Sequence, residues 1–174
     1  MEATGDVVVF ADSDMEIDLE TISNYHEALK HGDIVIASKR HSDSQLEVSI
    51  SRKILSISFN GLVRLLTGVP LNDTQSGLKA MKKNAFVDIF PRLAVKRYAF
   101  DVELLAVAHL YGLKVVEMPV SLKLDASFKV KQIWLMFVDL LGIAYRLRVI
   151  HWYQRQIPTK NNLQNFVSIV LREK

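Results

Sequence analysis

Three acidic side chains, Asp12, Asp14 and Glu16, stand on alternate residues directly after the apolar run VVVFA. Alternate side chains of an extended chain point to the same side, so these carboxylates converge if the backbone stays extended there. Convergent carboxylates in a chain without cysteine suit a hard divalent cation, Mg²⁺ or Mn²⁺. The competing interpretation is that the acids belong to a loop and favour the N-terminus of the next helix. The pattern by itself leaves both interpretations open.

The charged residues are unevenly distributed along the chain. The net charge of +3, from 22 basic and 19 acidic residues, is a mild imbalance. Acidic residues concentrate near the start, whereas basic residues are denser later, in fragments such as AVKRY, SFKVK and YRLRV. This division suits a metal ion at one place and phosphate or lipid headgroups at another, and we expect no nucleic-acid partner.

The apolar periodicity predicts the elements that would position these residues. VVVFA and DIVIAS are continuously apolar, as strands buried on both faces of a parallel sheet are, and a helix is expected between them. A second helix is expected over about residues 50–67, ended by GVP. SGLKAMKKNAF predicts a strand and a short helix, AFDVELLAVAHLYG a helix, and LKVVEMPVSLKL two extended segments divided at a proline. The fold class is therefore α/β, with a mostly parallel sheet and flanking helices.

Residues 131–157 predict a long amphipathic helix. Its aromatic and basic residues are those that favour a lipid headgroup boundary: Trp134, Tyr145, Trp152 and Tyr153 with Arg146, Arg148 and Arg155. The alternative is a helix packed against the core or another subunit. The longest apolar stretch, 133–145, is shorter than the ~20 residues that span a bilayer, and no signal peptide is visible. We therefore expect peripheral membrane contact and no secretion.

Six motifs, in order, resemble the family-2 glycosyltransferases that load a sugar onto a polyprenyl phosphate. They are VVFADSDMEID, DIVIASKR, DTQSGLKAM, KRYAFDVELL, GLKVVEMPV and SFKVKQ. The chain is similar to dolichyl-phosphate glucosyltransferases and dolichol-phosphate mannose synthases over about residues 5–150, with DTQSGLKAM and KRYAFDVELL closest to the glucosyl branch. The resemblance implies a partial GT-A-like, Rossmann-like fold. Residues 1–130 would be the C-terminal part of the catalytic domain, 131–157 the interface helix and 158–174 a tail helix.

The resemblance also implies roles for individual residues. Asp12, Asp14 and Glu16 would hold Mg²⁺ or Mn²⁺ on the nucleotide diphosphate, with Glu16 standing where the family commonly has Gln. Substrate and phosphate binding would fall to Lys39, Arg40, Arg52, Asp73, Lys79, Lys123 and Lys129. Asp101 is either an acceptor-side acid or a residue that stabilises the start of its helix. Asp73 and Lys79 have alternative roles in a turn and on the solvated surface.

The implied reaction is inverting transfer of a hexose, with glucose favoured, from UDP-glucose or GDP-mannose to dolichyl or polyprenyl phosphate. It would serve protein N-glycosylation or cell-surface glycan synthesis at the cytoplasmic face of a membrane. The part of the family's domain that binds the nucleotide base and ribose is missing from this sequence, so we expect either an absent N-terminal half or a homo-oligomer. Two alternatives stay open: a transferase that uses a sugar hydroxyl and needs Asp101 as its base, and a non-catalytic remnant or interaction module.

Overall fold

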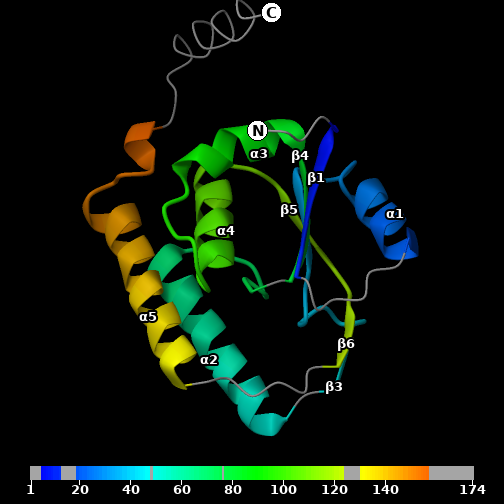
Figure 1. The fold of residues 1–174 in the computed structure, drawn as a ribbon, viewed down its shortest axis with the longest axis horizontal. Helices are drawn as coiled ribbons and strands as arrows, with labels where there is room; N and C mark the ends of the chain where they lie inside the picture. Colours follow the sequence, from blue (N-terminus) through cyan, green and yellow to red (C-terminus); the bar gives the residue numbers. More distant parts are fainter. Residues whose placement is uncertain (1–4, 13–18, 48, 76, 124–129, 157–174) are drawn as a thin grey trace, which may run out of the picture.

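The computed structural model describes residues 5–12, 19–47, 49–75, 77–123 and 130–156 (Figure 1). Its strands are β1 (Val7–Ala11), β2 (Ile34–Ala37), β3 (Gln45–Glu47), β4 (Leu78–Lys82), β5 (Val115–Met118) and β6 (Ser121–Lys123). Its helices are α1 (Leu19–Ala28), α2 (Ile50–Thr67), α3 (Lys83–Ile89), α4 (Phe100–Leu110) and α5 (Val130–Ala144). The α/β class and the helix predicted over residues 50–67 are confirmed.

The main sheet has the strand order β1-β4-β2-β5. β1, β2 and β5 run in one direction, but β4 lies antiparallel between β1 and β2. Among the described strands of the main sheet, only β2 and β5 pair in parallel, which corrects the prediction of a mostly parallel sheet. The strands predicted from the apolar runs are confirmed, because a continuous apolar run indicates burial on both faces of a sheet. The direction of a strand was predicted wrongly, because an apolar run carries no information about direction.

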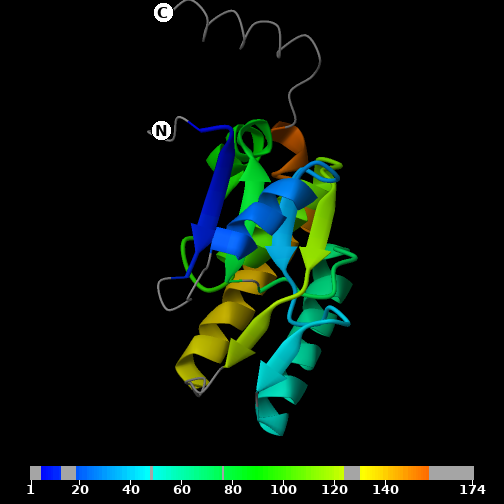
Figure 2. The same ribbon diagram turned by 90° about the vertical axis from the view of Figure 1, so that its right-hand side faces the viewer.

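Strand β2 is the centre of the core. Its residues alternate between two apolar layers: Ile34 and Ile36 pack with α3 and α4 on one face, and Val35 and Ala37 pack with α1 on the other. Figure 2 shows α1 crossing its face of the sheet. Because both faces are covered, the strand needs apolar residues at every position, which is what the run IVIA supplies.

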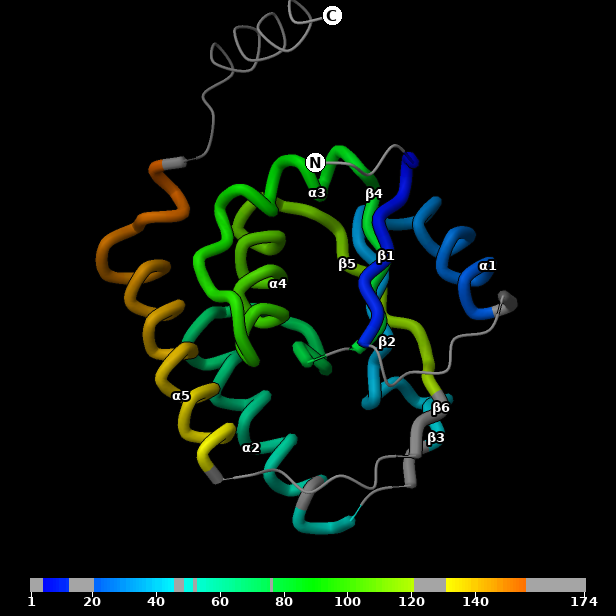
Figure 3. The backbone as a smooth tube through the Cα atoms, viewed as in Figure 1, coloured from blue at the N-terminus to red at the C-terminus, as the bar shows by residue number. Residues whose placement is uncertain are grey.

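Helices α2 and α5 form a further layer outside α4. A third apolar cluster fills the space between these three helices, with Val63, Val102 and Leu140 among its fully buried members. The backbone tube in Figure 3 shows α2 and α5 running side by side in the same direction. None of the helices in the described part of the chain is both long and apolar enough to cross a membrane.

The helix predicted over residues 131–157 is shorter than expected. α5 ends at Ala144 and continues as a π-helical turn, Tyr145–Val149, after which His151 takes a left-handed conformation with φ of 49°. Trp152 and Tyr153 then fold back onto the core instead of extending the helix, and Tyr153 is fully buried. The predicted tail helix, 158–174, lies outside the described residues.

A buried carboxylate anchors this returning segment. Glu103 of α4 is fully buried, and its Oε1 accepts hydrogen bonds from the Tyr153 hydroxyl and from Arg146 Nη2 at 3.1 Å. Its Oε2 accepts the backbone N–H groups of Ala94 and Val95 at 2.9 and 2.7 Å. Burial raises the pKa of the Tyr153 hydroxyl above its ordinary value, which keeps that hydroxyl a donor. The segment after α5 is therefore fixed to α4 by one carboxylate.

We predict that Glu103→Ala destabilises the fold, because it leaves the Arg146 charge, the Tyr153 hydroxyl and two backbone N–H groups without their acceptor. Breaking such a buried ion pair costs about 3–5 kcal/mol, measurable by urea unfolding. The matched control is Glu27→Ala, which removes an exposed pair with Lys30 at 2.7 Å and is expected to change stability far less. Equal losses in the two variants would contradict the anchoring role.

Candidate functional site

Six of the predicted site residues gather at one edge of the main sheet. The carboxyl ends of β1, β2 and β5 meet there with the amino end of β4. Asp12 directly follows β1, Lys39 is the second residue after β2, and Lys79 is the second residue of β4. Asp101 lies in the first turn of α4, which begins beside the same edge. Ligands of open α/β sheets bind at this kind of edge.

Lys79 and Asp101 form an ion pair at the base of the site. Lys79 Nζ lies 2.9 Å from Asp101 Oδ1, and the Lys79 side chain is only 4% exposed. Burial raises the pKa of the Asp101 carboxyl; Lys79 opposes this rise, the nearby charge of Asp12 adds to it, and Lys39 opposes it more weakly. The surface role left open for Lys79 is therefore excluded. A carboxyl with this pKa shift is suited either to proton transfer or to positioning the Lys79 charge.

Lys39 and Asp73 form a second pair a short way along the edge. Lys39 Nζ lies 3.3 Å from Asp73 Oδ2 and also donates to the backbone carbonyl of Gln75. The Lys39 backbone N–H donates to the same carboxylate oxygen at 2.9 Å, while Asp73 Oδ1 accepts the Gln75 N–H at 3.0 Å. Asp73 therefore makes the contacts of a turn, which was its alternative role, and the turn holds the Lys39 ammonium at this edge. Substrate binding by Asp73 stays a prediction.

Glu117 of β5 is a site residue that the sequence analysis missed. Its Oε1 accepts the backbone N–H groups of Asn72 and Asp73, both at 3.0 Å, and the Ser38 hydroxyl at 3.1 Å. Its Oε2 accepts the Asn72 side-chain amide at 2.8 Å. The available signal was a glutamate inside the otherwise apolar strand VVEM. Glu117 therefore fixes the turn that carries Asp73 against the ends of β2 and β5.

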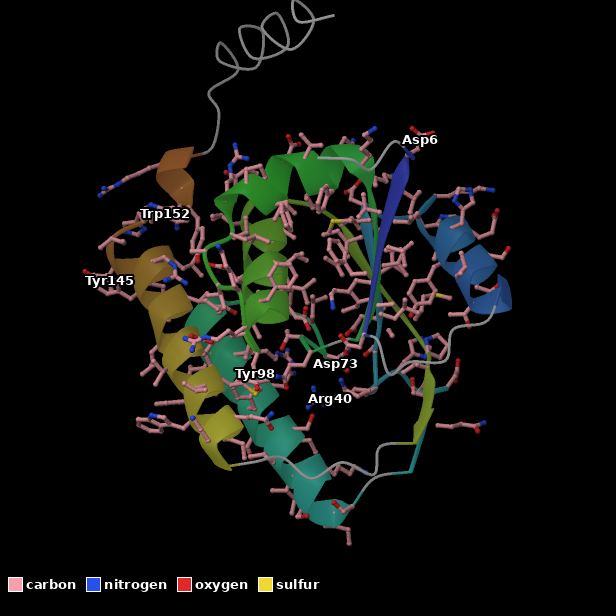
Figure 4. The ribbon with its side chains drawn as sticks, in the orientation of Figure 1. Asp6, Arg40, Asp73, Tyr98, Tyr145 and Trp152 are labelled. Carbon is pink, nitrogen blue, oxygen red and sulfur yellow. The ribbon has the colours of Figure 1, made fainter. Side chains whose placement is uncertain are left out.

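Arg40 supports the same turn from the helix side. Its guanidinium donates to the Asn72 carbonyl and to the Ser56 carbonyl and hydroxyl of α2, the latter two at 2.6 and 3.0 Å. Figure 4 shows Arg40 and Asp73 close together below the sheet edge. Asn60 of α2 adds two bonds, donating to the Asn72 carbonyl at 2.8 Å and accepting from the Thr74 hydroxyl at 3.0 Å. Several of the Arg40 donors are thus already used within the protein.

Five predicted site residues are described only by their backbone or lie outside the described residues. Arg52 lies in the first turn of α2 and Lys123 ends β6, opposite Glu47 in the small parallel β3–β6 sheet. Asp14, Glu16 and Lys129 lie outside the described residues. Of the three predicted metal ligands only Asp12 is described; it is exposed, and its carboxylate is an oxygen ligand of the type that Mg²⁺ or Mn²⁺ prefers. Within the described ranges, no three Asp, Glu, His or Cys side chains gather as a metal-binding group.

Comparisons with known proteins relate the chain to glycosyltransferases, although no family model matches it. Glycosyltransferase AglD of Haloferax volcanii is 28% identical over 170 residues, covering 97% of this chain and 26% of that protein. A dolichyl-phosphate beta-glucosyltransferase of Drosophila melanogaster is 32% identical over 92% of this chain and 53% of its own length. The human protein of that name is 32% identical over 74% of this chain and 41% of its own length. The chain therefore spans about half, or less, of these relatives.

We predict that Glu117→Leu releases the turn at Asn72 and Asp73, because two backbone N–H groups lose their acceptor. Exchange of these two amides, followed by NMR, should be at least ~10-fold faster, equivalent to ~1.4 kcal/mol. Glu117→Gln keeps one oxygen acceptor and should give a smaller acceleration. Unchanged protection in Glu117→Leu would show that the turn holds without this carboxylate.

Proposed function

Because the chain belongs to the glycosyltransferases of the dolichyl-phosphate glucosyltransferase type, we propose that it forms the diphosphate-side and acceptor-side part of such an enzyme. The reaction is transfer of glucose from a nucleotide sugar, UDP-glucose, to dolichyl or another polyprenyl phosphate. The observation that carries this proposal is the meeting of Asp12, Lys39, Lys79 and Asp101 at the ligand-binding edge of the sheet. Both substrates of the reaction carry phosphate, and this edge offers carboxylates and ammonium groups together.

The proposed step exchanges one bond to the anomeric carbon of glucose for another. An oxygen of the acceptor phosphate attacks this carbon, the bond to the nucleotide diphosphate breaks from the opposite face, and the diphosphate leaves with the bonding electrons. The acceptor phosphate is already an anion near neutral pH, so no general base is required. When bound by Asp12 with Asp14 and Glu16, Mg²⁺ or Mn²⁺ would neutralise charge on the leaving diphosphate.

The charge balance of the cluster supports a need for such an ion. The cluster holds four carboxylates, those of Asp12, Asp73, Asp101 and Glu117, against the three positive charges of Lys39, Arg40 and Lys79. The sum is −1 when all are ionised, and a cluster without net positive charge does not by itself attract two phosphate-bearing substrates. Further positive charge for the acceptor phosphate is assigned to Arg52, Lys123 and Lys129. This assignment is supported by the position of the start of α2 and of the β3–β6 sheet, which lie beyond the carboxyl ends of the strands of the main sheet (Figure 1).

A transfer assay with labelled UDP-glucose tests this function, using the chain joined to the part of the Drosophila relative that it does not match. We expect label to enter dolichyl phosphate in the presence of Mn²⁺, and chelation to abolish transfer reversibly. Asp12→Asn and Asp14→Asn should lower the rate by about 10²-fold or more, because the diphosphate loses its neutralising ligands.

Asp101→Asn separates the leading proposal from its alternative. Retained transfer agrees with an acceptor that needs no base, whereas loss of transfer together with product on a soluble sugar would favour the sugar-hydroxyl acceptor. Absence of product in every folded variant, with either acceptor, would support the non-catalytic remnant.

Peripheral contact with a bilayer is the second part of the proposal. Along one side of α2 and α5, nine large apolar side chains are 44–79% exposed at helical spacing. They are Ile50, Ile54, Ile57 and Leu65 on α2, and Trp134, Val138, Leu141, Tyr145 and Val149 on α5 and its π-helical turn. In Figure 4, Tyr145 points outward from this turn. We name these nine residues the two-helix surface.

The surroundings of the two-helix surface favour a lipid partner. Exposed apolar surface of this extent marks an interaction site in proteins that are otherwise water-exposed. Exposed basic residues flank it on both helices: Lys53, Arg64, Lys131 and Arg148. Basic side chains, together with Trp and Tyr, suit an anionic headgroup layer. A polyprenyl acceptor anchored in that layer would then meet the site from the same membrane.

We predict that Ile54→Asp and Trp134→Asp each lower partitioning onto anionic vesicles by at least ~10-fold, because burying one such side chain is worth about 1.5–3 kcal/mol. Co-sedimentation measures the effect. The control is Ile22→Asp on α1, which is also 45% exposed but lies on the opposite face of the sheet. A different result would show that the surface joins subunits: vesicle binding unchanged in all three variants, with Ile54→Asp and Trp134→Asp dissociating an oligomer.

A further inference from the structure

A second hollow lies at the far end of α4 from the candidate site. Its volume is about 350 Å³, and it is bordered by the ends of α2 and α4 and by the π-helical turn that follows α5. His109, at this end of α4, is eight residues after Asp101, which separates the two places by ~12 Å along the helix axis. The hollow is therefore separate from the Lys79–Asp101 edge.

The backbone that borders the hollow is irregular at two positions. The chain passes through a π-helical turn at Tyr145–Val149 and then places His151 at φ of 49°, a conformation that is costly for a residue with a side chain. π-helical turns and left-handed non-glycine residues both occur preferentially at functional sites. Two such features at one hollow point to a constraint other than packing.

A polar group in the hollow lacks a partner. Gln154 Oε1 is buried and accepts no hydrogen bond within the described residues. Its orientation is fixed, because Gln154 Nε2 donates to the Leu147 carbonyl at 2.8 Å. An unsatisfied buried acceptor costs about 1–3 kcal/mol, so this segment keeps an unfavourable feature beside the hollow.

The ionisable side chains that line the hollow are all of basic residue types. Arg148, His109 and His151 line it, and none of the described residues that line it is acidic. Helix capping explains the presence of Arg148 in part, since Arg148 Nη2 donates to the Leu65 carbonyl near the end of α2 at 3.0 Å. A guanidinium has five N–H donors, however, and neither imidazole is hydrogen-bonded through its side chain in the described part of the chain.

We propose that this hollow binds a phosphate group, with Arg148, His109 and His151 around the phosphate oxygens. The group is either a free sugar phosphate or the headgroup of a phospholipid. The lipid source is available because Leu65 and Val149 of the two-helix surface adjoin Arg148. The site goes beyond the proposed transfer reaction, since it shares no residue with the diphosphate and acceptor positions.

The test is a titration of the full chain with inorganic phosphate and glucose 1-phosphate, followed by NMR of the Gln154 side-chain amide. We expect saturable shifts, with Arg148→Gln weakening binding at least ~10-fold because charge-assisted hydrogen bonds are lost. Arg155→Gln removes the same charge from an exposed neighbour that does not line the hollow, and should leave binding unchanged.

A second variant guards against misfolding of the Arg148 variant. His109→Gln combined with His151→Asn removes both imidazoles, while Asn tolerates the positive φ, and it should also weaken phosphate binding. Vesicles that contain phosphatidylinositol distinguish the two sources of the phosphate group. If the chain binds these vesicles, Arg148→Gln abolishes that binding and glucose 1-phosphate gives no saturable shift, the ligand is the lipid headgroup. No saturable response to any probe, or equal responses in Arg148→Gln and Arg155→Gln, would overturn the site. Because no transfer is measured, either result leaves the proposed function untouched.

Discussion

The Glu117 carboxylate ties together the segments on which the candidate site depends. It accepts hydrogen bonds from the residue after β2 and from two successive residues of the turn before β4, and it does so from within β5. That turn holds Asp73, and Asp73 in turn holds Lys39. Without Glu117, the backbone N–H groups of Asn72 and Asp73 would lose their acceptor and the chain between α2 and β4 would be held less firmly. The Glu117 side chain of β5 thus fixes the loop between α2 and β4, which is not itself part of the sheet.

The site charges are paired before any substrate arrives. Lys79 is matched by Asp101 and Lys39 by Asp73, so the cost of removing these ammonium groups from water is offset inside the protein. Side chains held in this way need little rearrangement when a substrate binds, which is the condition for electrostatic stabilisation of a transition state. The same pairing leaves little net charge, which agrees with a proposed reaction that relies on an added cation.

Helix α4 links three functional regions through residues on different sides of its axis. Asp101 faces the sheet edge, Glu103 faces Arg146 and Tyr153 in the segment after α5, and His109 lies at the second hollow. The Glu103 contacts connect α4 to the segment that continues the two-helix surface. A bilayer that binds this surface would therefore act on the helix that carries Asp101.

The sequence alone determined the α/β class, the bounds of α2 and the strand–helix order, because apolar periodicity and Gly or Pro stops are local signals. It also indicated Lys39, Asp73, Lys79 and Asp101 through resemblance. Only the tertiary structure decided that β4 runs antiparallel between β1 and β2, that the last helix ends before His151, and that Glu103 and Glu117 are structural anchors. Strand direction depends on pairings such as Ile34 with Val115, 81 positions apart, and the partners of the Glu117 carboxylate lie up to 79 positions away. Such pairings leave no periodic trace in a single sequence.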